Sequence, residues 1–289
     1  MHCPCGNAQK NDYSICMKRL FLFTFTWILC FLAQEPIFAQ SLPDMTLSLD
    51  FNAEVKSLEE FMARFNGDET KPGIPDDDNK RRNNLLSLFD SNIDKKGKSR
   101  EQFVKELSEF IDTVIVNKTR FSIINSRLLV ECVCKMKYKK KIVNMTLVLR
   151  NEEYKKNMFR WAIVGVKGLQ EAGILAVDKV YPISPAEHEI HFIGLHDYLN
   201  ANPAHAYGYR GKDVKIDPLS VFFTLVHEGT LLFDIVEKQT FLFYDIPGYV
   251  ISINEITRSG QNSGWLISSF NKLSEIEKGK QIKKVLGYE

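Results

Sequence analysis

The chain has 289 residues, of which 44% are hydrophobic and 26% charged, and its formal net charge is +2 at pH 7. This near-neutral balance excludes the class of proteins that bind nucleic acid through a strongly basic surface. The length is sufficient for one large hydrophobic core or two small ones.

The first element in chain order is an export signal that ends at Ala39. Met17 and the basic pair Lys18–Arg19 precede an apolar run from Leu20 to Ala33, and small Ala39 follows where a signal peptidase can cut. We therefore expect cleavage near Ala39 and a mature protein in the periplasm or the outer envelope. The alternative is an uncleaved membrane anchor, although the run is shorter than the roughly 20 residues that span a bilayer. The residues before Met17 make an unusual leader, which suggests a misassigned upstream start.

Removal of residues 1–39 would leave a nearly neutral protein with two cysteines. The leader holds three of the 38 basic and two of the 36 acidic residues, which leaves 35 basic and 34 acidic. We therefore expect no nucleic-acid partner and no strong binding to a membrane surface. Cys132 and Cys134 alternate along an apolar segment, so both point to one face of a strand, where neighbouring thiols do not easily form a disulfide. We interpret them as small buried side chains; a redox or metal pair is the alternative.

Three helices are predicted before residue 120. Apolar residues recur at helical spacing over 53–66, and Gly67 should end that helix. A segment rich in proline, glycine and charge follows and predicts a solvated loop that includes the acidic triplet Asp76–Asp78. A second helix is expected at 83–89. A third should begin after Ser99, which forms a capping box with Gln102.

From Arg120 the apolar pattern alternates, which indicates strands. We predict strands at 120–137, 141–150, 158–167 and 174–181, with a hairpin at Tyr138–Lys141 between the first two. A helix or turn is expected at 184–187, and a helix should start at Asp217–Pro218 and end at Gly229. Four further strands are predicted, at 231–237, 240–246, 249–257 and 264–270. The charged tail from Lys272 to Glu289 should form a solvated helix with frayed ends.

The predicted elements indicate an α+β fold with three parts after the leader. Residues 41–183 combine N-terminal helices with a curved antiparallel sheet. Residues 184–271 add a second helix and four antiparallel strands, which either complete the same sheet or form their own. Residues 272–289 are the charged tail.

The segment 188–205 holds four of the five histidines of the mature chain. His191, His196 and Asp197 are candidate catalytic residues, and His188, His191 and His196 are an alternative metal site, because imidazole is a common metal ligand. On a helix His196 lies well away from the other two, and on a strand His188 and His191 face opposite ways. We therefore favour histidines that cap turns and expect no metal.

A tyrosine-rich loop supplies the candidate ligand-binding residues. These are Tyr207, Tyr209 and Arg210, of which the last two lie between Gly208 and Gly211, and this combination can stack on a ring or hold an anion. An ordinary surface turn is the alternative.

Two segments are similar to metal-binding motifs, but each lacks a residue that its motif requires. Residues 90–101 match the ligand positions of a calcium loop, yet Lys95 occupies the position that requires glycine, and three more cations follow. His227 begins a sequence similar to the zinc-protease helix, but Leu231 replaces the second histidine. No nucleotide-binding or nucleophile-elbow motif occurs in the sequence, so we expect no cofactor.

The early helices and the strands around C-V-C-K-M-K (132–137) and M-F-R-W-A-I-V (158–164) resemble the NTF2-like (cystatin-like) fold. The motifs D-P-L-S-V-F-F (217–223), F-Y-D-I-P-G-Y-V (243–250) and N-S-G-W-L-I (262–267) are similar to those of uncharacterised exported proteins of Bacteroides-type bacteria. The resemblance implies a helix packed across a bent antiparallel sheet and an exported protein. It implies no catalytic residue.

We therefore expect an exported, noncatalytic binding or envelope-interaction protein whose protein or small-molecule ligand enters the mouth of the bent sheet. The alternative is an NTF2-like isomerase or hydrolase, with or without a metal, that uses the segment His188–Asp197. The ligand and the oligomeric state stay open.

Overall fold

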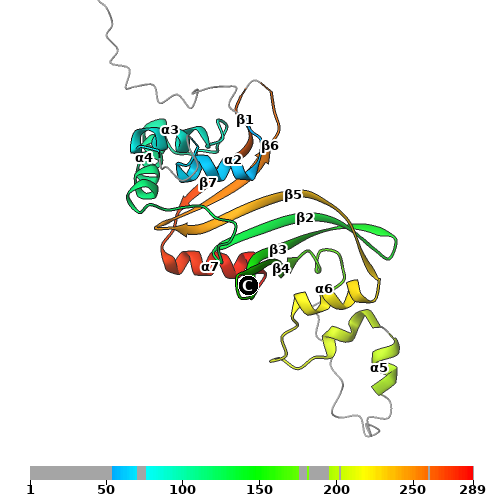
Figure 1. The fold of residues 1–289 in the computed structure, drawn as a ribbon. Helices are drawn as coiled ribbons and strands as arrows, with labels where there is room; N and C mark the ends of the chain where they lie inside the picture. The colour runs from blue at the N-terminus through cyan, green and yellow to red at the C-terminus, as the bar shows by residue number, and fades with distance from the viewer. Residues whose placement is uncertain are drawn as a thin grey trace, which may run out of the picture. The chain divides into compact units, whose positions relative to one another are not determined.

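The computed structural model describes residues 54–69, 76–175, 181, 195–201, 203–259 and 261–288. All of them belong to the compact unit Leu47–Glu289. They form a mixed α+β fold with one seven-stranded sheet and six α-helices (Figure 1). The elements are β1 (Glu54–Val55), α2 (Leu58–Asn66), α3 (Asp78–Ser87), α4 (Arg100–Val116), β2 (Leu128–Tyr138), β3 (Lys141–Lys155), β4 (Met158–Lys167), α5 (Leu195–Ala201), the 3-10 helix η1 (Pro203–Tyr209), α6 (Pro218–His227), β5 (Leu231–Ile246), β6 (Tyr249–Ile256), β7 (Ser263–Lys272) and α7 (Glu275–Leu286).

The sheet has the strand order β1-β7-β6-β5-β2-β3-β4. Only the short β1 is parallel to its neighbour; the other neighbours are antiparallel. Strands from both predicted segments, 41–183 and 184–271, therefore lie in one sheet. The strand β5 pairs with β2 along its length but with β6 only from Thr240 onward. Before Thr240, β5 has no pairing with β6. In this half of the sheet, which consists of β4, β3, β2 and β5 up to Gln239, the outer strands among the described ones are therefore β4 and β5.

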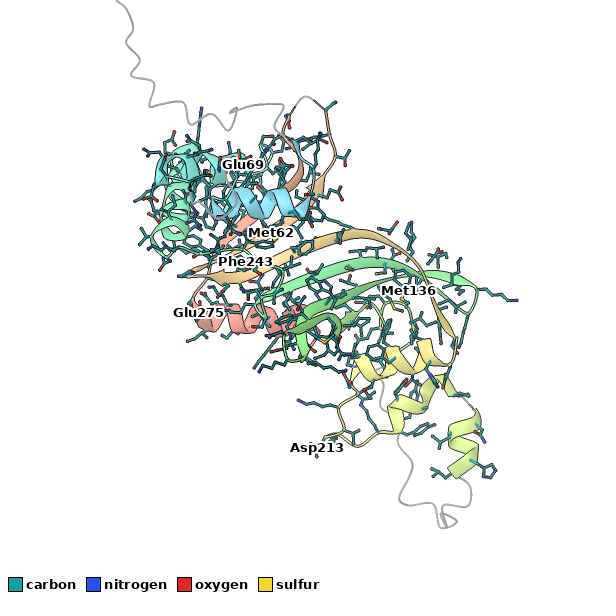
Figure 2. All side chains as sticks on the ribbon, in the orientation of Figure 1. Met62, Glu69, Met136, Asp213, Phe243 and Glu275 are labelled. Carbon is teal, nitrogen blue, oxygen red and sulfur yellow. The ribbon has the colours of Figure 1, made fainter. Side chains whose placement is uncertain are left out.

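Both faces of the sheet are covered by helices. Phe241 and Phe243 belong to a core cluster with α2, α3 and α4, whereas Leu242 and Tyr244 belong to a cluster with α7. Because successive side chains of a strand point to opposite faces, α7 covers the face opposite to the three early helices. A third cluster packs α6 against Met136 and other residues of β2, β3 and β4 (Figure 2).

The predicted helix starts and ends depend on local caps, and most are confirmed. Ser99 and Gln102 form the expected capping box of α4, and Asp217 caps α6 ahead of Pro218. Gly67 ends α2 with φ +72°. The helix expected at 53–66 begins late, however, because residues 54–55 form β1 and Ser57 is the N-cap.

The second predicted helix is wrong in its start, and the acidic triplet is not a solvated loop. The helix α3 begins at Asp78, and the Asp77 side chain accepts a hydrogen bond from the Lys80 backbone N–H at 2.9 Å. Carboxylates at a helix N-terminus satisfy its free N–H groups, which explains the aspartates at the N-cap and in the first turn of this helix.

Apart from the strand at 174–181, the predicted strands are confirmed with changed bounds. Lys139 and Lys140 have φ of +47° and +68°, as a two-residue hairpin turn requires. The strand expected from residue 120 starts at Leu128. The two strands expected at 231–237 and 240–246 are the single strand β5, because Lys238 and Gln239 continue the pairing with β2.

The charged tail is a packed helix and not a solvated one. In α7, Ser274 and Glu277 form a capping box, and Val285 is buried against the sheet. The Lys278 side chain is 1% exposed and donates hydrogen bonds to the carbonyl groups of Tyr244 and Ile246.

Some predictions lie wholly or largely outside the described residues. These are the export signal, most of the strand at 174–181 and the helix or turn at 184–187. Among the helices that the structure does describe, none combines the length and the hydropathy needed to cross a membrane.

Candidate functional site

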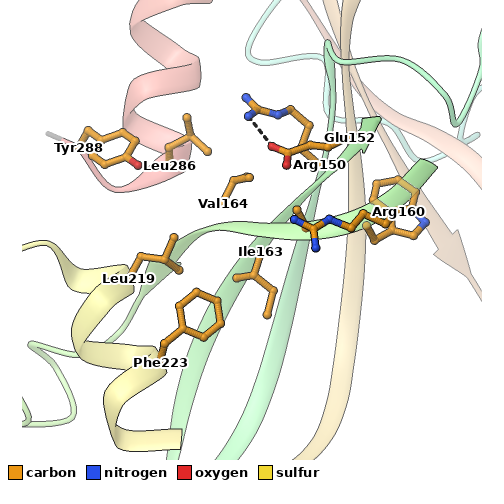
Figure 3. Close-up of a pocket in the computed structure, with 11 residues that line it drawn as sticks. Arg150, Glu152, Arg160, Ile163, Val164, Leu219, Phe223, Leu286 and Tyr288 are labelled. Atoms are coloured by element: carbon orange, nitrogen blue, oxygen red, sulfur yellow. Dashed lines mark hydrogen bonds and ion pairs between the residues drawn. The ribbon is translucent and has the colours of Figure 1, made fainter. Parts of the chain in front are cut away.

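A groove with a volume of about 680 Å³ runs along the outer edge of β4. The helix α6 forms one wall and the end of α7 the other (Figure 3). Its lining combines apolar and aromatic side chains with three charged ones: Arg150, Glu152, Arg160, Trp161, Ala162, Ile163, Val164, Leu219, Phe223, Leu286 and Tyr288. Small-molecule and peptide sites commonly have this composition, with few polar groups among apolar walls.

The wall formed by α6 follows from the amphipathic pattern of that helix. Phe222 is buried in the core with Leu219 and Leu225 packed around it, which fixes the helix on the sheet. Leu219 also reaches the groove, together with Phe223, which is 46% exposed. A large aromatic ring at this exposure leaves apolar surface available to a ligand.

The opposite wall depends on a glycine in β4. A Cβ atom at Gly165 would lie 2.8 Å from the carbonyl oxygen of Leu286, so only glycine allows the end of α7 to approach this closely. Gly287 then ends the helix with φ +80° and leads to Tyr288, which is 62% exposed beside the groove.

The charges of the groove are unevenly paired. Arg150 donates a hydrogen bond to the Glu152 carboxylate at 2.8 Å, as the dashed line in Figure 3 marks. The register places Arg160 opposite Glu152, yet its guanidinium lies 6.0 Å from the ring centre of Tyr154 and forms no ion pair with any carboxylate among the described residues. An exposed arginine beside aromatic rings can bind a carboxylate or phosphate group.

Among the predicted catalytic and metal-binding candidates, the structure describes the side chain of His196 and not those of the others. His196 lies on α5 and is exposed. His188 and His191 fall outside the described residues, and the side chains of Asp197 and His205 do as well. Where side chains are described, no group of three histidine, cysteine or acidic residues could hold a metal.

The tyrosine-rich candidates make contacts within the protein. The guanidinium of Arg210 donates to the Tyr207 carbonyl oxygen at 2.8 Å. The Tyr209 ring lies 5.7 Å from the ring of Tyr181, and Tyr207 packs against the core cluster under α6. These contacts hold η1 against Tyr181 and the core cluster under α6. None of the three residues lines the groove.

The cysteine pair has the predicted placement. Both thiols are free; Cys134 is buried and Cys132 half-buried. Burial raises the pKa of Cys134 to about 11 and also raises that of Cys132. A thiol with a raised pKa is a poor nucleophile and metal ligand, so this pair is better explained by packing.

The calcium-like loop is held by an arginine. Asp90 is 9% exposed, and its carboxylate accepts a hydrogen bond from the Arg258 guanidinium at 2.6 Å. The same carboxylate oxygen accepts from the Asn92 backbone at 2.8 Å. The bond from Arg258 joins the loop to the turn between β6 and β7, and the bond from Asn92 lies within the loop.

A second hollow, of about 510 Å³, lies between α2 and the segment at Phe121. Its two charged residues, Arg120 and Asp68, form an ion pair with each other. Since this pair uses both charges, the hollow offers a ligand fewer polar partners than the groove at β4 does.

Sequence patterns alone missed the groove residues Arg160, Trp161, Phe223 and Tyr288. The one available signal was the M-F-R-W start of β4, where a cation lies next to an aromatic residue on a strand. The groove itself joins residues near 160, 220 and 287, and no local pattern connects such distant segments.

A scan against protein-family models found no match, and searches of curated proteins and of solved structures found no significant similarity.

Proposed function

We propose that this protein is an exported, noncatalytic binding protein and that its ligand occupies the groove along β4. The proposal rests on one observation: apolar and aromatic walls surround an arginine, Arg160, that has no carboxylate partner among the described residues. Such a site favours a ligand that is partly apolar and carries an anionic group.

Two further parts of the proposal concern the fold and the location. The early helices α2 and α4 pack on one face of a sheet with curved strands (Figure 1), which supports a relationship to the NTF2-like fold. The leader at residues 17–39 supports export to the periplasm or the outer envelope. Protein recovered from the envelope fraction should lack residues 1–39 by intact mass spectrometry; full-length protein in the cytosol would contradict export.

The groove is tested with an apolar anion as probe, 8-anilinonaphthalene-1-sulfonate. The mature chain has two tryptophans: Trp161 in the groove, which is 40% exposed, and the buried Trp265. In a Trp265→Phe background, saturable binding of the probe should quench Trp161. Arg160→Glu and Phe223→Ser should each weaken binding about tenfold or more, since loss of one ionic or aromatic contact is on the order of 1.4 kcal/mol.

The matched control is Lys238→Glu, which reverses an exposed cation on the other edge of this half of the sheet. Its affinity for the probe should equal that of the parent protein. Equal binding by all three variants, or the absence of a saturable phase, would overturn the proposed site.

A further inference from the structure

Among the described strands, β4 is the outermost on its side of the sheet. No strand of the described region pairs with its outer side. In an antiparallel sheet every other residue of an edge strand directs its N–H and C=O groups outward, where another strand can bind them. The groove runs along this edge, so a ligand in it lies next to these backbone groups.

The outer edge of β4 differs from that of β5, which is the outer strand on the opposite side of this half of the sheet. In β5 the register leaves Asp234 and Glu237 without partners, which marks two bulges, and these residues form ion pairs with Lys137 and Lys135. Bulges and charges of this kind protect an edge against the addition of another strand.

The edge of β4 has much less of this protection. Its segment Trp161–Val166 contains no charged residue, and the register shows one bulge, at Val164, whose side chain lines the groove (Figure 3). Two helical walls flank this uncharged edge. Peptide-binding proteins that work by strand addition combine an open edge with adjacent side-chain pockets in this way.

We propose that the groove binds an extended segment of a partner protein, which adds to β4 as a further antiparallel or parallel strand. This inference rests on the proposed binding role of the groove. Apolar side chains of the segment contact Leu219 and Phe223 on one side and Leu286 and Tyr288 on the other. An acidic side chain of the segment pairs with Arg160, the one groove cation without a carboxylate partner among the residues described.

The contact is expected to be weak and transient. Six residues of strand extend over about 20 Å. Such a segment buries less surface than the roughly 1,200 Å² at the lower limit of stable interfaces, so dissociation constants on the order of micromolar are expected.

The experiment selects random dodecapeptides by display on the mature protein, residues 40–289. Enriched peptides should alternate apolar residues and carry an acidic one. Each selected peptide is then synthesised with single N-methyl groups along its backbone. Strand addition predicts that methylation weakens binding at every second amide, because only those amides donate to β4. Arg160→Glu should abolish the preference for an acidic residue, whereas Lys238→Glu should leave it unchanged.

The outcomes separate this inference from the proposed function. Peptides that need Phe223 but show no alternation in the methylation series would overturn strand addition and leave the groove as a binding site. The same conclusion follows if no peptide is enriched while the apolar anion still binds. Peptides that are lost on Ile235→Lys and retained on Phe223→Ser would place strand addition at β5 and overturn its assignment to β4. If neither the anion nor any peptide binds, the groove itself is overturned.

Discussion

At the scale of single residues, Lys278 is unusual because it is a lysine that is only 1% exposed. Its ammonium donates to the carbonyl oxygens of Tyr244 at 3.1 Å and Ile246 at 2.6 Å, and to the Glu275 carboxylate at 2.7 Å. Three donors therefore meet three acceptors, which is the condition under which a buried ammonium is tolerated.

Lys278→Met should lower the free energy of unfolding by about 2–4 kcal/mol, because it removes the charged hydrogen bonds that two buried carbonyl groups accept. Urea denaturation of the mature protein measures this change. Lys280→Met, at an exposed position of the same helix, should stay within about 0.5 kcal/mol of the parent protein. Equal effects of the two substitutions would contradict the role assigned to the buried bonds.

Cys134 should be chemically inert in the folded protein. Burial raises the pKa of its thiol to about 11, so at pH 8 roughly one molecule in a thousand carries the reactive thiolate. In a Cys132→Ser variant, a disulfide reagent such as 5,5′-dithiobis(2-nitrobenzoate) should react slowly with native protein and rapidly in urea. Similar rates in both conditions would show that Cys134 is accessible.

The same pKa shift has a consequence for stability. A group whose pKa is higher in the folded than in the unfolded state stabilises the folded protein at pH values below the unfolded-state pKa. This stabilisation is lost as the pH rises toward the folded-state pKa. Cys134 should therefore contribute to a decrease in stability between about pH 9 and pH 11. Cys134→Ala should make the stability of the protein less dependent on pH in this range.

At the scale of elements, the connection of β1 to β7 depends on one glycine. Gly264 has φ +92°, and a Cβ atom there would lie 2.1 Å from the carbonyl oxygen of Val55. Gly264→Ala should therefore separate β1 from β7 and lower the melting temperature by several degrees, as a loss of about 2–3 kcal/mol would.

Gly279→Ala is the opposite case. Gly279 lies inside α7, and no atom lies within 4 Å of the position of its added Cβ. Alanine has the higher helix propensity, so this substitution should stabilise the protein by about 0.5–1 kcal/mol. Calorimetry on both variants measures the contrast; a stabilised Gly264→Ala protein would refute the steric role of the glycine.

Elements whose ends depend on neighbouring residues could be predicted from sequence. The capping box at Ser99, the start at Asp217–Pro218 and the hairpin at Lys139–Lys140 each involve residues within a few positions of one another. The packing of α7 could not be predicted in this way. Its lysines indicate solvent, whereas Lys278 is buried because the end of a strand 32 to 34 residues earlier supplies acceptors for it.

The candidate site was beyond sequence reasoning for a related reason. The histidine segment supplies sequence-based candidates because its residues are close to one another in the chain. The groove is assembled from three segments whose residues are ordinary in isolation, such as Phe223 and Tyr288. Only the order of strands, which makes β4 an edge between two helices, gives them a common site.

At the scale of the whole molecule, the sheet joins the two predicted segments into one structure. The core cluster under α2, α3 and α4 includes six fully buried residues from beyond residue 184: Phe243, Ile246, Ile251, Ile253, Leu266 and Ile267. The strand β2 lies between β3 of its own segment and β5 of the other. The first segment therefore depends on the second for one neighbour of its central strand and for part of its core.

Residues 41–183 should consequently fail to fold when expressed alone. Burial of one large apolar side chain is worth about 2–3 kcal/mol, so the six missing side chains represent about 12–18 kcal/mol, at least as much as the entire stability of a typical domain. We expect a fragment with weak near-ultraviolet circular dichroism and poorly dispersed amide resonances, whereas the chain 40–289 should unfold in one cooperative transition. A fragment that unfolds cooperatively would show that the helices and β2–β4 form a stable core without β5. The first segment would then not depend on the second for its stability, although both contribute strands to one sheet.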